Sequence, residues 1–225
     1  MSKDLGLTPI PSKIVCVGKN FPDHAREMGS EPPSEPLLFL KPPSSLLAAG
    51  EAVRVPPGAG RVDFEGEVAF QVGRRASHVR ERDALDYLSA VLPLNDITCR
   101  DFQTRDGQWT RAKGFDTFCP VGRPVPLSEV DLAALEVETR VNGEVRQAAP
   151  LSDALFSIEV LVGYISRIMT LEPGDLIATG TPPGIGPIVP WDEVEVSIPG
   201  VGTVANPVRA GSGEPWLDGV GKPGD

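Results

Sequence analysis

Two glutamates, Glu65 and Glu67, lie two residues apart in an otherwise apolar run, FEGEVAF, at positions 64–70. In a β-strand, side chains two residues apart lie on one face, about 6.5 to 7 Å apart, so flexible carboxylates there can converge on one ion. Asp96 follows a second apolar run, YLSAVLPL, and could supply a third oxygen ligand. Three carboxylates with no histidine nearby form a hard, all-oxygen site, which suits Mg²⁺, Mn²⁺ or Ca²⁺ better than Zn²⁺.

Each of these carboxylates also has an interpretation without a metal. Glu65 and Glu67 could form the solvated face of an edge strand, and the pattern alone favours that interpretation. Asp96 could cap a short helix, which is the commoner role of Asn-Asp before a helix. A buried charge without a partner costs several kcal/mol, so the two interpretations predict opposite environments for the glutamates.

A second group of residues could move a proton. His24 and Glu27 are three residues apart in DHAREM and can face the same way on a helical turn, where the glutamate would orient the imidazole as a general base toward water. Lys113, in TRAKGFDTFCP, could meet a developing oxyanion if it is partly desolvated. The ordinary alternatives are an exposed polar turn and a solvated lysine. From the residues alone, those alternatives are favoured.

Short apolar segments separated by Pro and Gly predict the elements that position these residues. We expect a strand at 13–18, then one or two helical turns ending at Gly29. The alternation over 62–72 predicts a strand with one face in the core. Asn95 or Asp96 could cap a short helix that carries Arg100 and Gln103.

The second half of the chain predicts two hairpins and the main helix. A hairpin turns at Asn142-Gly143, and another closes the fold over 192–208. Apolar residues recur at helical spacing from Ile158 to Met169, after a possible cap at Ser157. Many strands with one substantial helix indicate an α+β fold that is mainly β, with an antiparallel or mixed sheet.

The composition of the 225-residue chain limits the possible partners. A net charge of -10 has the wrong sign for a surface that neutralises phosphates, so nucleic acid is not an expected partner. No stretch reaches the roughly 18 to 20 apolar residues that cross a bilayer, and the first residues lack the apolar region of a signal peptide. We therefore expect a cytoplasmic protein without a membrane partner. Three cysteines without a CxxC pair predict small core residues.

With these motifs in order, the chain closely resembles the fumarylacetoacetate hydrolase family, in particular its short single-domain acylpyruvate hydrolase branch. Order and spacing agree over most of residues 13–190. The matching segments are VCVGKNFPDHAREMG, EPLLFLKPPSSL, VDFEGEVAFQVGR, LNDITCRDFQ, WTRAKGFDTFCPVG, VNGEVRQ and GDLIATGTPPGIGP.

The resemblance implies a role for each candidate residue. Glu65, Glu67 and Asp96 would bind one Mg²⁺ or Mn²⁺, for which Ca²⁺ could substitute. His24 and Glu27 would lie on a lid at about 19–30 that orders over the substrate, and Lys113 would touch the reacting oxygens. The residues that would hold the substrate are Lys19, Arg100, Gln103 and Thr181.

Two positions differ from many relatives of this family. Lys19 stands where arginine is frequent, which keeps the charge but loses the planar fork. Asp63 and Phe64 stand where some relatives have a histidine pair. Neither is a metal ligand in the family pattern, so the expected metal site is unaffected.

The resemblance also implies a mixed β-roll fold, with a catalytic domain at 1–208, a flexible tail at 209–225 and assembly as a homodimer. The implied reaction is cleavage of the C–C bond of acylpyruvates, 2,4-dioxo acids such as fumarylpyruvate, to pyruvate and a carboxylic acid in aromatic catabolism. Relatives that isomerise 2-hydroxyhepta-2,4-diene-1,7-dioate, or that decarboxylate or tautomerise oxaloacetate, pass through the same enolate. A catalytically silent acid-binding protein is the non-enzymatic alternative, and the presence of all six metal and catalytic residues argues against it.

Overall fold

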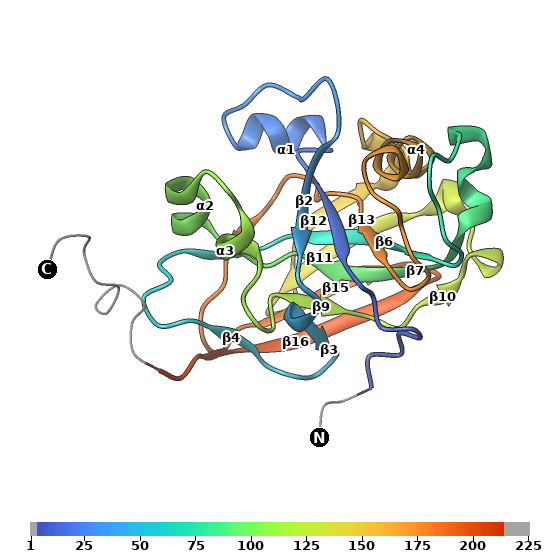
Figure 1. The fold of residues 1–225 in the computed structure, drawn as a ribbon. Coiled ribbons are helices and arrows are strands. Elements are labelled where there is room, and N and C mark those ends of the chain that lie inside the picture. Colours follow the sequence, from blue (N-terminus) through green and yellow to red (C-terminus); the bar gives the residue numbers. More distant parts are fainter. Residues whose placement is uncertain (1–3, 214–225) are drawn as a thin grey trace, which may run out of the picture.

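The computed structural model describes residues 4–213, and its largest element is an eight-stranded mixed sheet (Figure 1). β1 pairs in parallel with β13, and β3 with β9, while the other pairs of this sheet are antiparallel. In spatial order its strands are β2 (Leu37–Lys41), β1 (Ile14–Gly18), β13 (Leu176–Ala178), β6 (Gly66–Val72), β7 (Leu88–Asn95), β9 (Cys119–Val121) and β3 (Leu46–Ala48), with β10 (Val125–Pro126) on β7.

Two smaller sheets complete the strand structure. The five-stranded sheet contains β12 (Glu144–Pro150), β11 (Glu136–Val141), β15 (Glu193–Ile198), β16 (Gly202–Ala210) and β4 (Val53–Val55). The three-stranded sheet contains β14 (Gly186–Pro187), β5 (Val62–Phe64) and β8 (Thr98–Cys99). Both predicted hairpins are confirmed. Asn142 and Gly143 take φ angles of 53° and 82°, as a two-residue hairpin turn requires.

Helices are few, which confirms the mainly β fold with one main helix. The α-helices are α1 (Pro22–Glu27), α2 (Arg100–Asp106), α3 (Thr110–Lys113) and α4 (Ile158–Ile168). The 3₁₀ helices are η1 (Pro43–Ser45), η2 (Glu81–Tyr87), η3 (Leu127–Glu129), η4 (Leu132–Ala134) and η5 (Leu151–Asp153). None of the helices within residues 4–213 has the length and apolar character needed to cross a membrane.

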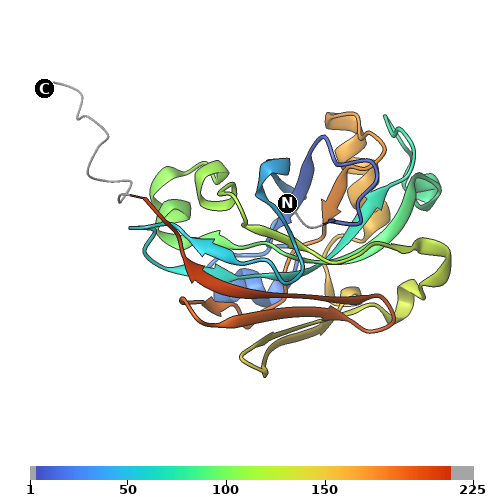
Figure 2. The ribbon, with the colours of Figure 1, turned by 90° about the horizontal axis from the view of Figure 1, so that it is seen from below.

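The largest core cluster joins the main helix to both large sheets. Val68 and Phe70 of β6 pack in one cluster with Leu161 and Ile165 of α4 and with Val196 of β15. Figure 2 shows the five-stranded sheet along one side of the molecule, with α2 and α4 toward the opposite side. The three cysteines are buried and free, as predicted.

The strand predicted over 62–72 is instead two strands of different sheets, β5 and β6, separated by Glu65. Every residue of both strands is buried. The expected solvated face is absent because β6 is a central strand between β13 and β7, with packed side chains on both sides. Alternation in this sequence therefore separates an apolar core face from a buried polar face.

Three further expectations, about the starts of two helices and the start of the tail, are corrected. Cys99, and neither Asn95 nor Asp96, precedes α2 as its cap residue. Ser157 stands at the N-cap of α4, but its side chain makes no capping bond. Arg209 and Ala210, which were expected in a flexible tail, belong to β16 and pair with β4. Residues 214–225 of that tail lie outside the described residues.

Candidate active site

Glu65, Glu67 and Asp96 meet in the interior of the protein. A carboxylate oxygen from each lies within 4.8 Å of one from each of the others, and the side chains belong to residues that are buried. The pairing of β6 with β7 produces this meeting, because Gly66 lies opposite Asn95. The backbone N–H of Asp96 donates to the carbonyl of Glu65 (2.8 Å), and the N–H of Glu65 donates to Oδ1 of Asn95 (3.0 Å). Asp96 is therefore held beside the two glutamates and caps no helix.

Three cations surround two of the carboxylates. Lys113 Nζ donates to Oε2 of Glu65 (2.8 Å) and to Oδ2 of Asp96 (2.7 Å), and Lys41 Nζ donates to Oδ1 of Asp96 (2.6 Å). Arg100 Nη2 lies 2.7 Å from Oε1 of Glu65. Burial alone would raise the pKa of Glu65, but the charges of Lys113 and Arg100 outweigh it and hold that pKa below its ordinary value. Burial alone would lower the pKa of Lys113, but the charges of Asp96 and Glu65 outweigh burial and raise that pKa.

Glu67 has no such ion-pair partner among the described residues. The hydrogen bond found at its carboxylate comes from the backbone N–H of Gly180 (2.7 Å). Burial, then the charges of Asp96 and Glu65, raise the pKa of Glu67 well above its ordinary value. A divalent cation would supply the missing positive charge, and three carboxylate oxygens are the ligands that Mg²⁺ and Mn²⁺ prefer. The three residues therefore fit the expected metal.

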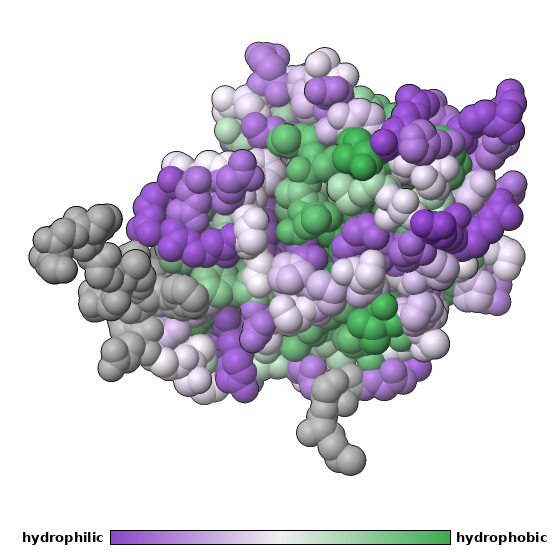
Figure 3. All heavy atoms as spheres, in the orientation of Figure 1, coloured by the Kyte–Doolittle hydropathy of each residue, from purple (hydrophilic) through white to green (hydrophobic). Residues whose placement is uncertain are grey.

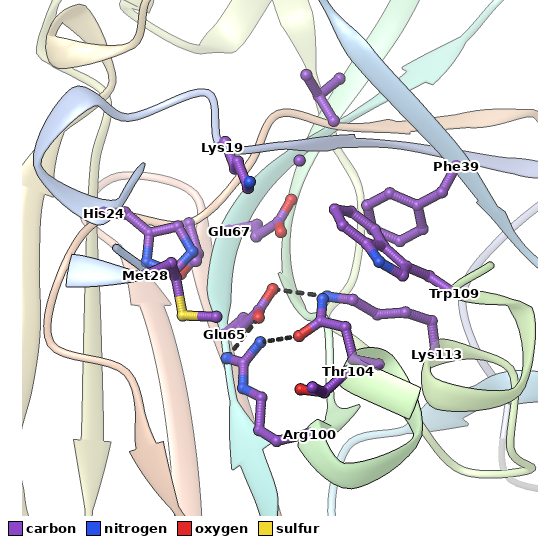
Figure 4. Close-up of a pocket in the computed structure, with 14 residues that line it drawn as sticks. Lys19, His24, Met28, Phe39, Glu65, Glu67, Arg100, Thr104, Trp109 and Lys113 are labelled. Atoms are coloured by element: carbon purple, nitrogen blue, oxygen red, sulfur yellow. Dashed lines mark hydrogen bonds and ion pairs between the residues drawn. The ribbon is translucent and has the colours of Figure 1, made fainter. Parts of the chain in front are cut away.

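A cavity of about 200 Å³ opens onto Glu65 and Glu67 (Figure 4). Phe39 and Trp109 form an apolar part of its wall, with their rings edge to face at a centroid distance of 5.3 Å. Asp96 is fully buried beside the cavity, and Glu27 lies behind His24. The other eight predicted site residues line the cavity: Lys19, His24, Glu65, Glu67, Arg100, Gln103, Lys113 and Thr181.

His24 and Glu27 form the predicted pair on α1. Nδ1 of the buried His24 lies 3.1 Å from Oε2 of Glu27, and the backbone N–H of Gly184 donates to Oε1 of Glu27 (3.1 Å). The start of the expected lid is anchored, because the side chain of buried Asn20 donates to the carbonyl of Phe156 (3.1 Å) and accepts from its N–H (2.9 Å). The imidazole therefore faces the cavity with its Nδ1 edge held by a carboxylate.

The predicted substrate-binding residues come from three separate segments. On α2, Arg100 Nη1 donates to Oε1 of Gln103 (2.8 Å). After β13, the hydroxyl of Thr181 donates to the carbonyl of Gly66 (2.9 Å). Lys19 follows β1 with a φ of 57°, a left-handed backbone that turns the chain into α1. Chain segments far apart in sequence thus bring these polar groups to one cavity.

Five residues at the site were not predicted. Lys41 and Asp63 are buried charges that hold site residues, and Gln147 donates to the hydroxyl of Thr181 (2.8 Å). Phe39 and Trp109 shape the cavity wall. Asp63 had a usable signal, because it shares the strand parity of Glu65 and Glu67. The other four stand in segments that match the family, EPLLFLKPPSSL, WTRAKGFDTFCPVG and VNGEVRQ, but no local pattern distinguishes them there.

Residues 13–209 match the family described as fumarylacetoacetate (FAA) hydrolase C-terminal. The oxaloacetate tautomerase FAHD1, mitochondrial, of Bos taurus is 44% identical over 193 residues, covering 84% of this chain and 87% of the relative. The crystal structure of 2-hydroxyhepta-2,4-diene-1,7-dioate isomerase from Mycobacterium marinum is 44% identical, with a TM-score of 0.83, over 91% of this chain and 77% of that one.

A third similar protein was crystallised as a complex. The crystal structure of fumarylpyruvate hydrolase from Pseudomonas aeruginosa in complex with Mn²⁺ and pyruvate is 31% identical, with a TM-score of 0.81, over 88% of this chain and 89% of that one. Relatives of the chain thus include a hydrolase, an isomerase and a tautomerase. The family match covers nearly the whole described chain, and this chain belongs to the fumarylacetoacetate hydrolase family.

Proposed function

We propose that this chain is a divalent-metal-dependent enzyme of short 2-oxo acids, and that it hydrolyses the C–C bond of acylpyruvates. The observation that carries the proposal is that His24, paired with Glu27, lines one cavity together with Glu65 and Glu67 of the acidic triad. A positioned base beside a metal site is what the addition of water to a carbonyl needs. The similar P. aeruginosa hydrolase, with Mn²⁺ and pyruvate, supports this class of substrate and ion.

Glu65, Glu67 and Asp96 would hold Mg²⁺ or Mn²⁺, for which Ca²⁺ could substitute, and the ion would supply a Lewis acid to the 2-oxo acid. Lys113 already bridges two of these carboxylates and faces the cavity. Its ammonium adds positive charge where negative charge develops on the substrate.

His24 acts as the base. Glu27 accepts a hydrogen bond from Nδ1–H of His24, which leaves the Nε2 lone pair to take a proton from water. The hydroxide adds to the 4-carbonyl, the bond between C3 and C4 breaks, and its electrons form the enolate of pyruvate. A proton delivered to C3 completes pyruvate, and the other product is the carboxylate of the acyl group. One water is consumed for each bond cleaved.

A second candidate reaction is the keto–enol tautomerisation of oxaloacetate. The 44% identity to a bovine oxaloacetate tautomerase favours it. The same base would remove a proton from C3 of oxaloacetate, and the enolate would be protonated on oxygen. The isomerase and decarboxylase alternatives use the same enolate. Because the M. marinum isomerase structure is similar, isomerisation by this chain is also tested.

One panel of substrates tests the proposal. Acetylpyruvate, fumarylpyruvate, oxaloacetate and 2-hydroxyhepta-2,4-diene-1,7-dioate would be assayed with Mg²⁺ and with Mn²⁺, with Glu67→Ala as the control that lacks a ligand. We expect metal-dependent release of pyruvate from an acylpyruvate and none from the control. Faster tautomerisation of oxaloacetate than any cleavage would assign the second reaction. Turnover of none of the four by metal-loaded protein that still binds oxalate would support a silent binding protein.

The homodimer expected from the sequence is also proposed here. β2 is an edge strand, and its Leu37 and Leu40 are exposed. Figure 3 shows an apolar area on the face where β2 lies. Light scattering on the purified protein would test the assembly, and replacing both leucines by glutamate should yield monomers if this edge forms the contact. The cytoplasmic location and a role in aromatic catabolism stay predictions.

A further inference from the structure

Asp63 is a fully buried carboxylate that the proposed chemistry does not use. It lies on β5 between two guanidinium groups. Arg61 Nε donates to its Oδ1 (2.7 Å) and Arg61 Nη2 to its Oδ2 (3.0 Å), while Arg100 Nε donates to Oδ2 (2.8 Å). Arg61 is largely exposed, whereas the side chain of Arg100 is 11% exposed. The inner arginine, Arg100, is therefore the one that Asp63 connects to the cavity.

Arg100 distributes its donors over three partners. Nε binds Asp63, Nη1 binds Gln103, and Nη2 lies 2.7 Å from Oε1 of Glu65. The direction of that last contact is wrong for a hydrogen bond, and Nη2 is a buried donor without a hydrogen-bond partner. Buried donors in proteins are almost always satisfied, and Nη2 has only the charge of Glu65 to satisfy it. Figure 4 shows the guanidinium below Glu65 at the cavity wall.

Removing the carboxylate of Asp63 would change which carboxylate the guanidinium of Arg100 pairs with. A guanidinium forms its strongest contact as a planar, two-bond fork with one carboxylate. Glu65 is the other carboxylate within reach of Arg100. Without the bond at Nε, Arg100 can turn and pair with Glu65 through both of its terminal nitrogens. Such a fork would draw the guanidinium toward Glu65 and out of its place in the cavity wall.

We propose that Asp63 is a positioning residue that holds the Nε edge of Arg100, so that the guanidinium keeps its place in the cavity wall and binds a carboxylate of the 2-oxo acid there. This inference rests on the proposed substrate class, but it does not depend on which reaction follows binding. Because the arginine would hold the carboxylate equally in the ground state and in the transition state, loss of its orientation should raise KM and leave kcat nearly unchanged.

Asp63→Asn tests the inference, because asparagine keeps the size of the side chain but removes its charge. We expect the dissociation constant of oxalate, measured by calorimetry on Mn²⁺-loaded protein, to rise about tenfold or more, as expected for loss of a charge-assisted contact. KM should rise equally, with kcat within about threefold. The affinity for Mn²⁺ alone should fall by less than the affinity for oxalate, because Asp63 bonds to Arg61 and Arg100 and affects the triad only through the contact of Arg100 with Glu65.

Two variants separate positioning from a general structural role. Arg61→Ala removes the other guanidinium from the same carboxylate and should leave oxalate binding within about twofold. In an Arg100→Ala background, Asp63→Asn should add less than about twofold, since coupled residues are not additive. A full tenfold loss in that background, or an equal loss of Mn²⁺ affinity, would overturn the inference.

Folding failure would not leave the question open. If Asp63→Asn does not fold, Arg100→Lys supplies the test. Lysine lacks the planar guanidinium, so its ammonium cannot bond to Asp63 through one nitrogen and reach the cavity with another. We expect it to weaken oxalate binding as much as Asp63→Asn is expected to, and wild-type binding would contradict the inference. Oxalate binding is measured without turnover, so failure of the proposed reaction and failure of this inference give different results.

Discussion

Lys41 Nζ lies 2.6 Å from Oδ1 of Asp96, and neither side chain is exposed to solvent. The same ammonium donates to the backbone carbonyls of Ile97 (3.3 Å) and Lys113 (2.5 Å), so all of its donors have partners. Lys41 thus holds a predicted metal ligand and the end of the helix that carries Lys113. A buried ion pair of this kind fixes a geometry more reliably than it adds stability.

Replacing Lys41 by methionine should destabilise the protein. The change leaves Asp96 with one ammonium partner and leaves two backbone carbonyls unpaired, and breaking a buried pair in this way costs about 3 to 5 kcal/mol. Urea unfolding of the metal-free protein would measure the free energy of unfolding. Arg75→Ala, which breaks an exposed pair with Glu172, is the control and should cost less than about 1 kcal/mol. Equal effects of the two variants would contradict the prediction.

The two histidines of the chain provide a matched pair of variants. His24→Asn should lower kcat by about 10²- to 10⁴-fold, the usual contribution of a general base. His78→Asn should not change kcat, because His78 is exposed and does not line the cavity, and asparagine tolerates its φ of 53°. Mn²⁺ affinity, followed by calorimetry, should be the same in both variants. Wild-type turnover by His24→Asn would rule out the assigned base.

Gly180 should resist substitution for two reasons. Its φ is 94°, and a Cβ there would meet Asn20 Cβ at 2.8 Å and the carbonyl of Val17 at 2.9 Å. Its N–H is also the donor to Glu67. Gly180→Ala should therefore displace the loop and weaken Mn²⁺ binding about tenfold or more, as losses of groups that orient metal ligands do.

Gly143→Ala is the control for backbone strain. Its φ of 82° is similar, but a Cβ there has open space. The alanine should cost about 1 to 2 kcal/mol through strain alone, with Mn²⁺ affinity unchanged. Equal stability losses at Gly180 and Gly143, with equal Mn²⁺ affinities, would show that the contacts of Gly180 are unimportant.

Asp175 should make the stability of the protein sensitive to acid. Burial alone would raise its pKa, but bonds from Lys13, the backbone N–H of Glu172 and Ser12 outweigh it and lower that pKa. The stability from this carboxylate is fully present above its pKa in the unfolded chain, about 3.9, and is lost as the pH falls through the lower pKa of the folded protein.

Asp175→Asn should therefore cost about 2 to 3 kcal/mol at pH 7, and the difference from the wild type should shrink as the pH falls below about 4. Urea unfolding of both proteins at pH 7 and at a pH below about 4, in the presence of a chelator, would measure this difference in the free energy of unfolding. A difference that is constant between these pH values would show that the charge of Asp175 does not contribute.

Local patterns in the sequence were sufficient for much of the fold. The Asn142-Gly143 turn and the apolar spacing of α4 depend on residues near one another in the chain, so they could be predicted from short segments. The candidate site could be located too, because the acidic pair, Asp96 and the His24–Glu27 pair stand in motifs whose order and spacing resemble one family.

The environment of those residues was decided by the tertiary structure. Strand parity predicts that Asp63, Glu65 and Glu67 point the same way, but not that they are buried, since burial of β6 depends on β13 and β7 lying on either side of it. The pairing of Lys41 with Asp96 joins positions 55 residues apart. Charges interact through space over a few ångströms, whereas sequence records only distance along the chain. For that reason, the sequence could name the acidic residues, Lys113 and Arg100, but only the fold could add Lys41 and show that these cations pair with the buried carboxylates.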